Sequence, residues 1–392
     1  MLDRLQDTPP DALLALIAQF AADEREDKID LGVGVYRTDD GATPVFGAIK
    51  AAEQRLWEEQ DSKSYLGPEG DRGFVHALMP IIFGADATMG GRIEGVQTPG
   101  GTGAVRLAIA LAERAGVTRV HVGTPSWPNH IPIIEDVGLE AATFAHAKED
   151  GSADVDALLE IIRQGREGDA VLIHACCHNP SGIDYTAEQW DAIADALAES
   201  PVLPIIDSAY QGLGTGLEED AAGLRKVLAK VPHALIAYSC DKNFGLYRDR
   251  VGAFYAKVAE PAQMAAAMSN AAALARANWS MPPDHGGAAV RIVLRDEELR
   301  EQWQQELDGM RQRLRWVRAT LAGAQKKVEG VPLAHLEEQN GLFAMLPLNK
   351  DQIGQLRDQH AVYMAGSGRI NIAGLTKGNI DKFIAALTDV AG

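Results

Sequence analysis

The chain has 392 residues, of which 46% are hydrophobic and 23% charged, so its length predicts two or three domains and its composition excludes disorder as the dominant state. Its 37 Lys and Arg residues against 55 Asp and Glu residues give a formal net charge of −18. Nucleic acids and anionic membranes bind clustered positive charge, so neither is expected as a main partner.

The first ten residues are expected to form an extended arm, because Pro9 and Pro10 resist helix formation. Residues 13–20 are apolar, but Asp11 precedes them and an acidic segment follows without a small-residue cleavage site, so no export signal is predicted. No apolar run approaches the roughly 18 residues of a membrane span.

Short apolar runs alternate with amphipathic stretches through the middle of the chain. Buried strands are predicted at residues 117–123, 170–176, 202–207 and 234–239, and helices at residues 104–115, 187–199 and 221–229. This alternation predicts a mostly parallel sheet covered by helices on both faces. Functional sites in such folds lie at the carboxyl ends of the strands.

The C-terminal third has a different pattern. Residues 256–324 are predicted to be largely helical, with apolar residues at heptad-like spacing, and residues 333–392 carry mixed strand and helix signals. We expect a long helix that leads into a smaller α+β unit.

Cysteine usage is sparse. The three cysteines, Cys176, Cys177 and Cys240, are an odd number with two of them adjacent, which does not make a disulfide framework. Reduced thiols in a cytoplasmic protein are the simpler interpretation.

Polar residues follow the predicted strands, and a glycine-rich segment, TPGGTG at residues 98–103, leads directly into a predicted helix. Each of these features alone is typical of an ordinary turn or loop. Together, in chain order, they indicate one chemistry. The residues concerned are His174, His178 and Asn179 after one strand, Asp207 and Tyr210 after the next, and Ser239, Lys242 and Arg250 after the last.

On these residues the chain resembles the fold-type I, pyridoxal-phosphate-dependent aminotransferases of the aspartate and aromatic class. The resemblance runs nearly end to end. Its blocks are DLGVGVYR (30–37), YLGPEG (65–70), QTPGGTGA (97–104), PSWPNH (125–130), CCHNPSG (176–182), DSAYQG (207–212), KNFGLYRDRVG (242–252) and SGRINIAGL (367–375). It implies an α/β fold, with a large cofactor-binding domain at residues 45–309 and a smaller α+β domain made of residues 11–44 and 310–392.

The resemblance assigns the catalytic residues Lys242, Asp207 and Tyr210. Lys242 would bind pyridoxal phosphate covalently and carry the proton of the reaction, which requires an amine whose pKa is lowered by burial or nearby positive charge. Asp207 would keep the pyridine nitrogen protonated, which makes the ring an electron sink. Tyr210 and Asn179 would hydrogen-bond the 3′ oxygen, and Trp127 would stack on the ring.

The cofactor phosphate needs donors and positive charge. The resemblance assigns it to Gly101 and Thr102 at a helix N-terminus, to Ser239, to Arg250 and to Tyr65 of a second subunit.

Three histidines accompany these residues. His130 is expected to support Asp207, and His174 and His178 are expected to have structural roles near the site. No metal is predicted, because no third ligand is evident in the sequence.

Substrate recognition is expected to depend on two arginines. By resemblance, Arg369 binds the α-carboxylate with a bidentate fork, and Arg276 binds a distal carboxylate across a homodimer interface. The residues that the resemblance assigns to the substrate are Gly34, Trp127, Asn179, Arg276 and Arg369. The expected partners are amino acids, 2-oxo acids and a second copy of the chain.

Two positions depart from the family pattern. Aspartate-selective members usually have Asn where this chain has Met281, and the thioether makes that wall apolar and adaptable, as in the aromatic enzymes. We therefore predict transamination of phenylalanine, tyrosine or aspartate with 2-oxoglutarate; a strictly aspartate-selective enzyme is the alternative. Asp241 stands where most relatives have Ser or Ala, and it is expected to point away from the cofactor, since neighbours on an extended segment alternate in direction.

Other functions agree less well with the sequence. An NAD-dependent dehydrogenase needs a third glycine that GVGVYR (32–37) lacks. A non-catalytic cofactor-binding regulator would need an additional DNA-reading domain, for which no residues remain. A lyase or decarboxylase that uses the same cofactor is the nearer rival, and the two arginines favour amino exchange.

Overall fold

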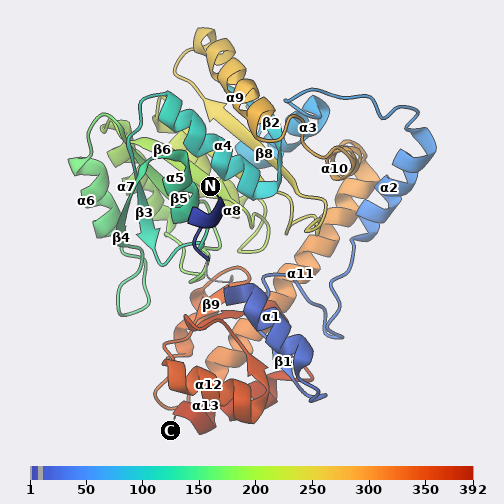
Figure 1. Ribbon diagram of the computed structural model, residues 1–392, viewed down its shortest axis with the longest axis vertical. Coiled ribbons are helices and arrows are strands. Elements are labelled where there is room, and N and C mark those ends of the chain that lie inside the picture. The colour runs from blue at the N-terminus through green and yellow to red at the C-terminus, as the bar shows by residue number, and fades with distance from the viewer. Residues whose placement is uncertain (1, 8–11, 392) are drawn as a thin grey trace. The chain divides into compact units, whose positions relative to one another are not determined.

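A computed structural model describes residues 2–7 and 12–391 of the chain (Figure 1). These residues form two compact units. The larger unit comprises residues 44–313 and 339–341, and the smaller one comprises the described residues among 1–43, 314–338 and 342–392. Of the predicted N-terminal arm, Leu2–Arg4 form a 3-10 turn, and residues 8–11 lie outside the described part of the chain.

A seven-stranded sheet is the centre of the larger unit. Its strand order is β2-β8-β7-β6-β5-β3-β4, and β8 runs antiparallel to both of its neighbours, whereas the other pairs are parallel. The prediction of a mostly parallel sheet is confirmed. The strands are β2 (Ile93–Pro99), β3 (Arg119–Thr124), β4 (Glu140–Ala145), β5 (Asp169–His174), β6 (Leu203–Ser208), β7 (Ala234–Ser239) and β8 (Val251–Lys257).

Helices cover both faces of this sheet. The helices of the larger unit are α2 (Gly47–Glu59), α3 (Arg72–Phe83), α4 (Gly100–Arg114), α5 (His130–Val137), α6 (Val155–Gln164), α7 (Ala187–Ala198), α8 (Glu219–Lys230), η2 (Pro261–Gln263), α9 (Met264–Asn278), α10 (His285–Arg295) and the first part of α11 (Glu297–Gly323). Figure 1 shows α4 running across the strands.

The core explains why the predicted strands are so apolar. Every residue of β5, β7 and β8 is buried, because these strands are covered on both sides. Alternate residues such as Leu235 and Phe254 belong to the core cluster that contains α4. The next residue of β8, Tyr255, points the other way and donates a hydrogen bond to the Val75 carbonyl of α3 (2.8 Å).

The smaller unit contains α1 (Ala12–Ala22), β1 (Ile29–Asp30), the end of α11, η3 (Ala334–Glu338), β9 (Phe343–Met345), α12 (Lys350–His360), β10 (Val362–Tyr363), β11 (Arg369–Asn371), η4 (Ile372–Gly374) and α13 (Ile380–Ala391). Its strands form two short pairs, β1 with β10 and β9 with β11. The buried guanidinium of Arg318, on α11, donates to the Phe343 carbonyl (2.7 Å) and so fixes β9 to the helix. The mixed α+β pattern predicted for residues 333–392 is confirmed.

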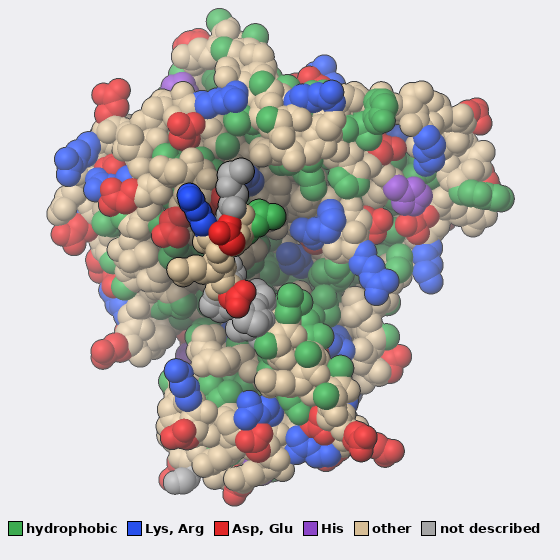
Figure 2. Space-filling view, in the orientation of Figure 1, with side chains coloured by type: hydrophobic (Ala, Val, Ile, Leu, Met, Phe, Trp, Pro, Cys, Tyr) green, Lys and Arg blue, Asp and Glu red, His purple; other side chains and the backbone are tan. Residues whose placement is uncertain are grey.

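Charge is not gathered into one patch on the face of the molecule that Figure 2 shows. Among the described residues on the face drawn in Figure 2, acidic and basic side chains are interspersed. No helix in the described part of the chain is long and apolar enough to span a membrane.

Candidate active site

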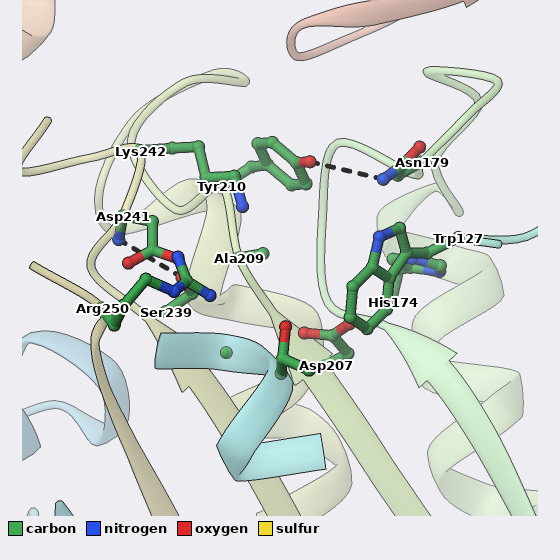
Figure 3. A pocket seen from close by; sticks show the side chains of 12 residues that line it. Trp127, His174, Asn179, Asp207, Ala209, Tyr210, Ser239, Asp241, Lys242 and Arg250 are labelled. Carbon is green, nitrogen blue, oxygen red and sulfur yellow. Dashed lines mark hydrogen bonds and ion pairs between the residues drawn. The ribbon is translucent and has the colours of Figure 1, made fainter. Parts of the chain in front are cut away.

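A pocket lies at the carboxyl ends of the strands of the larger unit (Figure 3). The strand register brings its parts together, because His174 at the end of β5 pairs with Asp207 of β6, and Ser239 at the end of β7 pairs with Gly252 of β8. The pocket is lined by Gly101, Thr102, Trp127, His174, Asn179, Asp207, Ala209, Tyr210, Ser239, Asp241, Lys242 and Arg250.

Lys242 is carried by the turn that follows β7. Its Nζ lies 5.3 Å from the centre of the Tyr210 ring and has no hydrogen-bond partner among the described residues. Burial lowers the pKa of Lys242 and the nearby Arg250 adds to this, whereas the carboxylates of Asp241 and Asp207 oppose the change. An amine with these properties is deprotonated more often than a surface lysine, as a nucleophile or a base requires.

Asp207 lies at the end of β6, and His130 holds it. His130 Nε2 lies 3.1 Å from one carboxylate oxygen, and its Nδ1 lies 2.8 Å from the Ser126 hydroxyl. Burial alone would raise the pKa of Asp207, but the hydrogen bond and charge of His130, together with the charges of His174 and Lys242, keep the pKa below its usual value. The second oxygen, Oδ1, has no hydrogen-bond partner within the described chain. The site therefore offers an ionised carboxylate with one oxygen available.

Tyr210 and Asn179 face each other across the pocket. Asn179 Nδ2 donates to the Tyr210 hydroxyl (3.4 Å), as the dashed line in Figure 3 shows. The buried Asn179 Oδ1 has no hydrogen-bond partner among the described residues. A buried amide oxygen without a partner is costly, which indicates that a ligand or water completes its bonding. Trp127 lines the pocket and packs edge-on against His130, with ring centres 5.1 Å apart.

The N-terminus of α4 forms a cradle for an anion. Gly100 has a φ of +69°, and a Cβ on Gly101 would lie 2.8 Å from the Ser239 Cβ, so both positions require glycine. The first N–H groups of a helix are free, and the helix dipole favours negative charge there. Ser239 and Arg250 lie beside this helix end and add a hydroxyl and a guanidinium.

Asp241 also belongs to this wall, so the expectation that it points away is wrong. Residues 241–244 form a turn rather than an extended segment, and the side chains of Asp241 and Lys242 therefore both line the pocket. Asp241 Oδ2 accepts from Arg250 Nη1 (2.5 Å), and Oδ1 accepts from the Val251 N–H (3.2 Å). Burial raises the pKa of Asp241, although Lys242 and Arg250 counteract part of that effect.

Three histidines near the pocket are neutral side chains. Burial lowers the pKa of His174 to about 3 and that of His146 to about 4. His174 lines the pocket, and His178 stacks on His146 with ring centres 3.5 Å apart. The ligand atoms of His130, His174 and Asp207 lie within 4.8 Å of one another, a spacing that a metal also uses, but the bonds of His130 to Ser126 and Asp207 account for its position. His174 and Ala209 line the pocket, although the sequence analysis gave neither residue a role in binding a ligand. Their positions at or just after the ends of β5 and β6 could have indicated that they belong to the site.

Arg369 and Gly34 belong to the smaller unit, where both lie beside the aromatic ring of Phe343. Arg369 Nη2 donates to the Gly32 carbonyl (2.8 Å), and its guanidinium lies 4.5 Å from the centre of the Phe343 ring. A Cβ on Gly34 would lie 2.7 Å from the same ring. Asn371 fixes the loop by donating to the carbonyls of Val33 (2.6 Å) and Val35 (2.8 Å).

Tyr65 and Arg276 do not line the pocket of their own chain. Tyr65 is 93% exposed, and the exposed Arg276 donates to the Ser280 hydroxyl. Tyr65 belongs to the loop between α2 and α3, whereas Arg276 belongs to the last turn of α9, and the sequence implied that both act in a neighbouring subunit.

A buried glutamine joins the loop that carries Tyr65 to the loop that follows α9, the helix of Arg276. Gln97 of β2 accepts from the Asp71 N–H (2.8 Å) and donates to the Pro283 carbonyl (2.7 Å). A second link is the Leu66 N–H, which lies 3.2 Å from Met281 Sδ. We refer to this Gln97-centred connection as the loop clip.

The pocket fits pyridoxal phosphate by its own chemistry. It combines a glycine-lined anion cradle, an amine without a hydrogen-bond partner, an ionised acid with an available oxygen, and the buried Asn179 oxygen that lacks a partner within the described residues. An α/β enzyme with this arrangement is built to hold a phosphorylated aldehyde.

Comparisons with known proteins agree. The family model for aminotransferase class I and II matches residues 26–387. The tyrosine aminotransferase of Rhizobium meliloti is 48% identical over 376 residues, which cover 96% of each chain, and the aspartate aminotransferase of Escherichia coli is 41% identical over the full length of both. A solved aromatic-amino-acid aminotransferase of Burkholderia pseudomallei, covalently bound to pyridoxal phosphate, superposes with a TM-score of 0.96 at 32% identity and full coverage of both chains.

The chain therefore belongs to the class I and II aminotransferases, which depend on pyridoxal phosphate and act on amino acids and 2-oxo acids. The family predicted from the sequence is confirmed, and the dehydrogenase and regulator alternatives are excluded.

Proposed function

We propose that this enzyme transfers the amino group of phenylalanine, tyrosine or aspartate to 2-oxoglutarate, giving the corresponding 2-oxo acid and glutamate. The observation that carries the proposal is the arrangement of Lys242 and Asp207 in one pocket, with a lowered pKa at both groups. Relatives named for tyrosine, aspartate and aromatic amino acids support this range of substrates.

When bound, pyridoxal phosphate supplies an aldehyde carbon and a pyridine ring that accepts the electrons released at the substrate Cα. Lys242 holds the cofactor and then, as a free amine, moves the proton from Cα. Its lowered pKa raises the fraction of neutral amine that can accept this proton.

Asp207 holds the proton on the pyridine nitrogen. Its carboxylate stays ionised because His130 bonds its far oxygen, which leaves Oδ1 to accept from the ring. Tyr210 and Asn179 orient the 3′ oxygen, and Trp127 excludes water from the ring face.

The N-terminus of α4 would hold the phosphate. Gly101 and Thr102 would donate backbone N–H groups, Ser239 a hydroxyl and Arg250 a guanidinium. Tyr65 of a second subunit completes this set.

The substrate is held by carboxylate-binding arginines. Arg369 binds the α-carboxylate, with Gly34 leaving room beside it, and Arg276 of a second subunit binds the distal carboxylate of aspartate or 2-oxoglutarate. Met281 supplies a flexible apolar wall for an aromatic side chain.

These assignments require a homodimer. Its support in this chain is the exposure of large apolar side chains in the loop that carries Tyr65: Tyr65 is 93% exposed and Leu66 49%. Exposed apolar groups of this size are typical of interaction surfaces. We also infer a cytoplasmic location, which the three buried free cysteines support.

Visible absorbance of the holoenzyme tests the reaction. Phenylalanine, tyrosine or aspartate should bleach the bound cofactor, and 2-oxoglutarate should restore the absorbance. Bleaching that an oxo acid does not reverse would indicate a lyase or decarboxylase. Bleaching by aspartate alone would establish the alternative, a strictly aspartate-selective enzyme.

A further inference from the structure

The phosphate cradle contains an acid of its own. Asp241 is buried, and its carboxylate accepts from Arg250 Nη1 at 2.5 Å and from the Val251 N–H at 3.2 Å. A Cβ on Gly100 would lie 2.7 Å from Arg250 Nη2 and 3.1 Å from Asp241 Oδ2, which puts the ion pair against the N-terminus of α4. The carboxylate therefore lies where the helix end and the guanidinium favour an anion.

A cofactor phosphate would meet the same groups. Among the residues that line the pocket, Arg250 and Lys242 are the only Lys or Arg side chains, and Lys242 is committed to the aldehyde. Arg250 must then serve two anions, and the phosphate and the Asp241 carboxylate repel each other at short range. Burial strengthens this repulsion, because the carboxylate is only 4% exposed.

We propose that Asp241 competes with the cofactor phosphate for Arg250, so that this enzyme binds pyridoxal phosphate more weakly, through its phosphate, than the same pocket without that carboxylate would. The inference depends on the proposed function for the position of the phosphate. Asp241 is a tuning residue of the cradle and takes no part in the chemical step.

A merely structural role is the competing explanation. The carboxylate also fixes Val251 at the start of β8, so its removal could loosen the pocket and weaken every ligand. The two explanations predict opposite changes for a ligand that carries a phosphate.

The test compares pyridoxal phosphate with pyridoxal, which lacks the phosphate. Dissociation constants for both are measured on cofactor-free wild type, Asp241→Asn and Asp241→Ser by the absorbance change on binding. Any effect of Asp241 on Lys242 alters both ligands equally, so the ratio of the constants isolates the phosphate. We expect the preference for pyridoxal phosphate over pyridoxal to rise by about tenfold or more in both variants.

A preference that is unchanged or smaller in the variants would overturn the proposal. Asp241→Asn keeps the shape of the side chain and carries the test if Asp241→Ser does not fold. Asp296→Asn is the matched control. Asp296 forms an ion pair with Arg55 whose N–O distance is also 2.5 Å, but neither residue lines the pocket, so this variant should leave the ratio unchanged.

A separate experiment tests the proposed function itself. Borohydride reduction of the loaded wild type followed by peptide mapping should place the cofactor on Lys242. Labelling of another lysine would contradict the assigned site, whereas an unchanged ratio with Lys242 labelled would contradict only the role of Asp241.

Discussion

Two aspartates in one pocket show how their surroundings determine their chemistry. Asp207 and Asp241 are both buried, yet the pKa of the first is lowered and that of the second is raised. For Asp207 burial is outweighed by His130 together with the charges of His174 and Lys242, whereas for Asp241 burial outweighs Lys242 and Arg250. The surroundings therefore move the pKa values of the two acids in opposite directions.

His130→Ala should make Asp207 easier to protonate. Because its folded pKa is lowered, the Asp207 carboxylate is present above that value and is lost as the pH falls through it. Without the His130 hydrogen bond and charge the folded pKa rises, so the acid limb of kcat against pH should move upward by about one pH unit. His233→Asn, at an exposed histidine that does not line the pocket, should leave the limb in place. An acid limb that His130→Ala does not move would show that Asp207 is held by other groups.

The sequence was most informative about residues that directly follow buried strands. Asp207, Ser239 and Lys242 were predicted correctly as pocket residues because the strand before each is an uninterrupted apolar run. The direction of the Asp241 side chain was mispredicted. It is determined by contacts with Arg250 and Val251, which lie nine and ten residues further along the chain, outside the local pattern on which the prediction was based.

At the scale of elements, β2 contributes more than a strand to the sheet. Its Gln97 is fully buried and makes the loop clip that joins the Tyr65 loop to the loop after α9. We propose that the Tyr65 loop and the end of α9, with Arg276, reach the second subunit. The exact position of these segments should therefore affect the binding of substrate more than the proton transfer.

Gln97→Leu should raise the KM for aspartate more than it lowers kcat. The substitution leaves the Asp71 N–H and the Pro283 carbonyl without their partner, at a cost of about 1–3 kcal/mol in the free energy of unfolding. Tyr255→Phe also removes one buried hydrogen bond, from the neighbouring β8, and is the control for lost stability. If both variants change KM equally, the loop clip has no special part in substrate binding.

The loop after Tyr210 depends on one buried carboxylate. Asp220 of α8 accepts from the N–H groups of Gly212 (2.8 Å), Gly214 (2.9 Å) and Thr215 (2.8 Å). Asp220→Ala should lower the free energy of unfolding by roughly 3 kcal/mol, because buried donors lose a charged acceptor. Urea denaturation measures the change. The exposed Asp191→Ala, which breaks only a surface pair with Lys226, should stay within about 0.5 kcal/mol of wild type.

The predicted elements differ from the structure where an apolar run fits both the period of a helix and that of a strand. Residues 234–239 were predicted correctly as β7 because the run is short and bounded. Residues 256–257 were assigned to a helical region but end β8, whose run VGAFYAK is buried on both faces and so shows no alternation. The pairing of β8 with β2 and β7 makes these residues a strand, which the local sequence pattern alone does not determine.

At the scale of the whole molecule, the proposed active site needs two chains. Lys242 lies in the pocket, whereas the exposed side chains of Tyr65 and Arg276 lie outside it. If these two residues complete the partner's pocket, subunits that are inactive for different reasons should complement each other.

Lys242→Ala and Arg276→Ala should each be nearly inactive toward aspartate, and a reassociated mixture should regain activity. Half of the dimers in an equal mixture are hybrids with one complete site of two, so about a quarter of the wild-type activity is expected. Mixing Lys242→Ala with Asp207→Ala is the control, since both defects lie in the same pocket and no hybrid site can be complete. A lack of recovery in the first mixture, with dimers present, would contradict shared sites.

The place of Gln97 in β2 has a thermodynamic consequence. Two residues after the loop clip, this strand ends at Pro99 and continues into the cradle at Gly100 and Gly101. A single strand thus connects the cradle that we propose for the cofactor anion with the segments that we propose meet the other chain. Reciprocal linkage then requires that cofactor occupancy and subunit association strengthen each other, so the loaded dimer should dissociate at lower protein concentration than the stripped one.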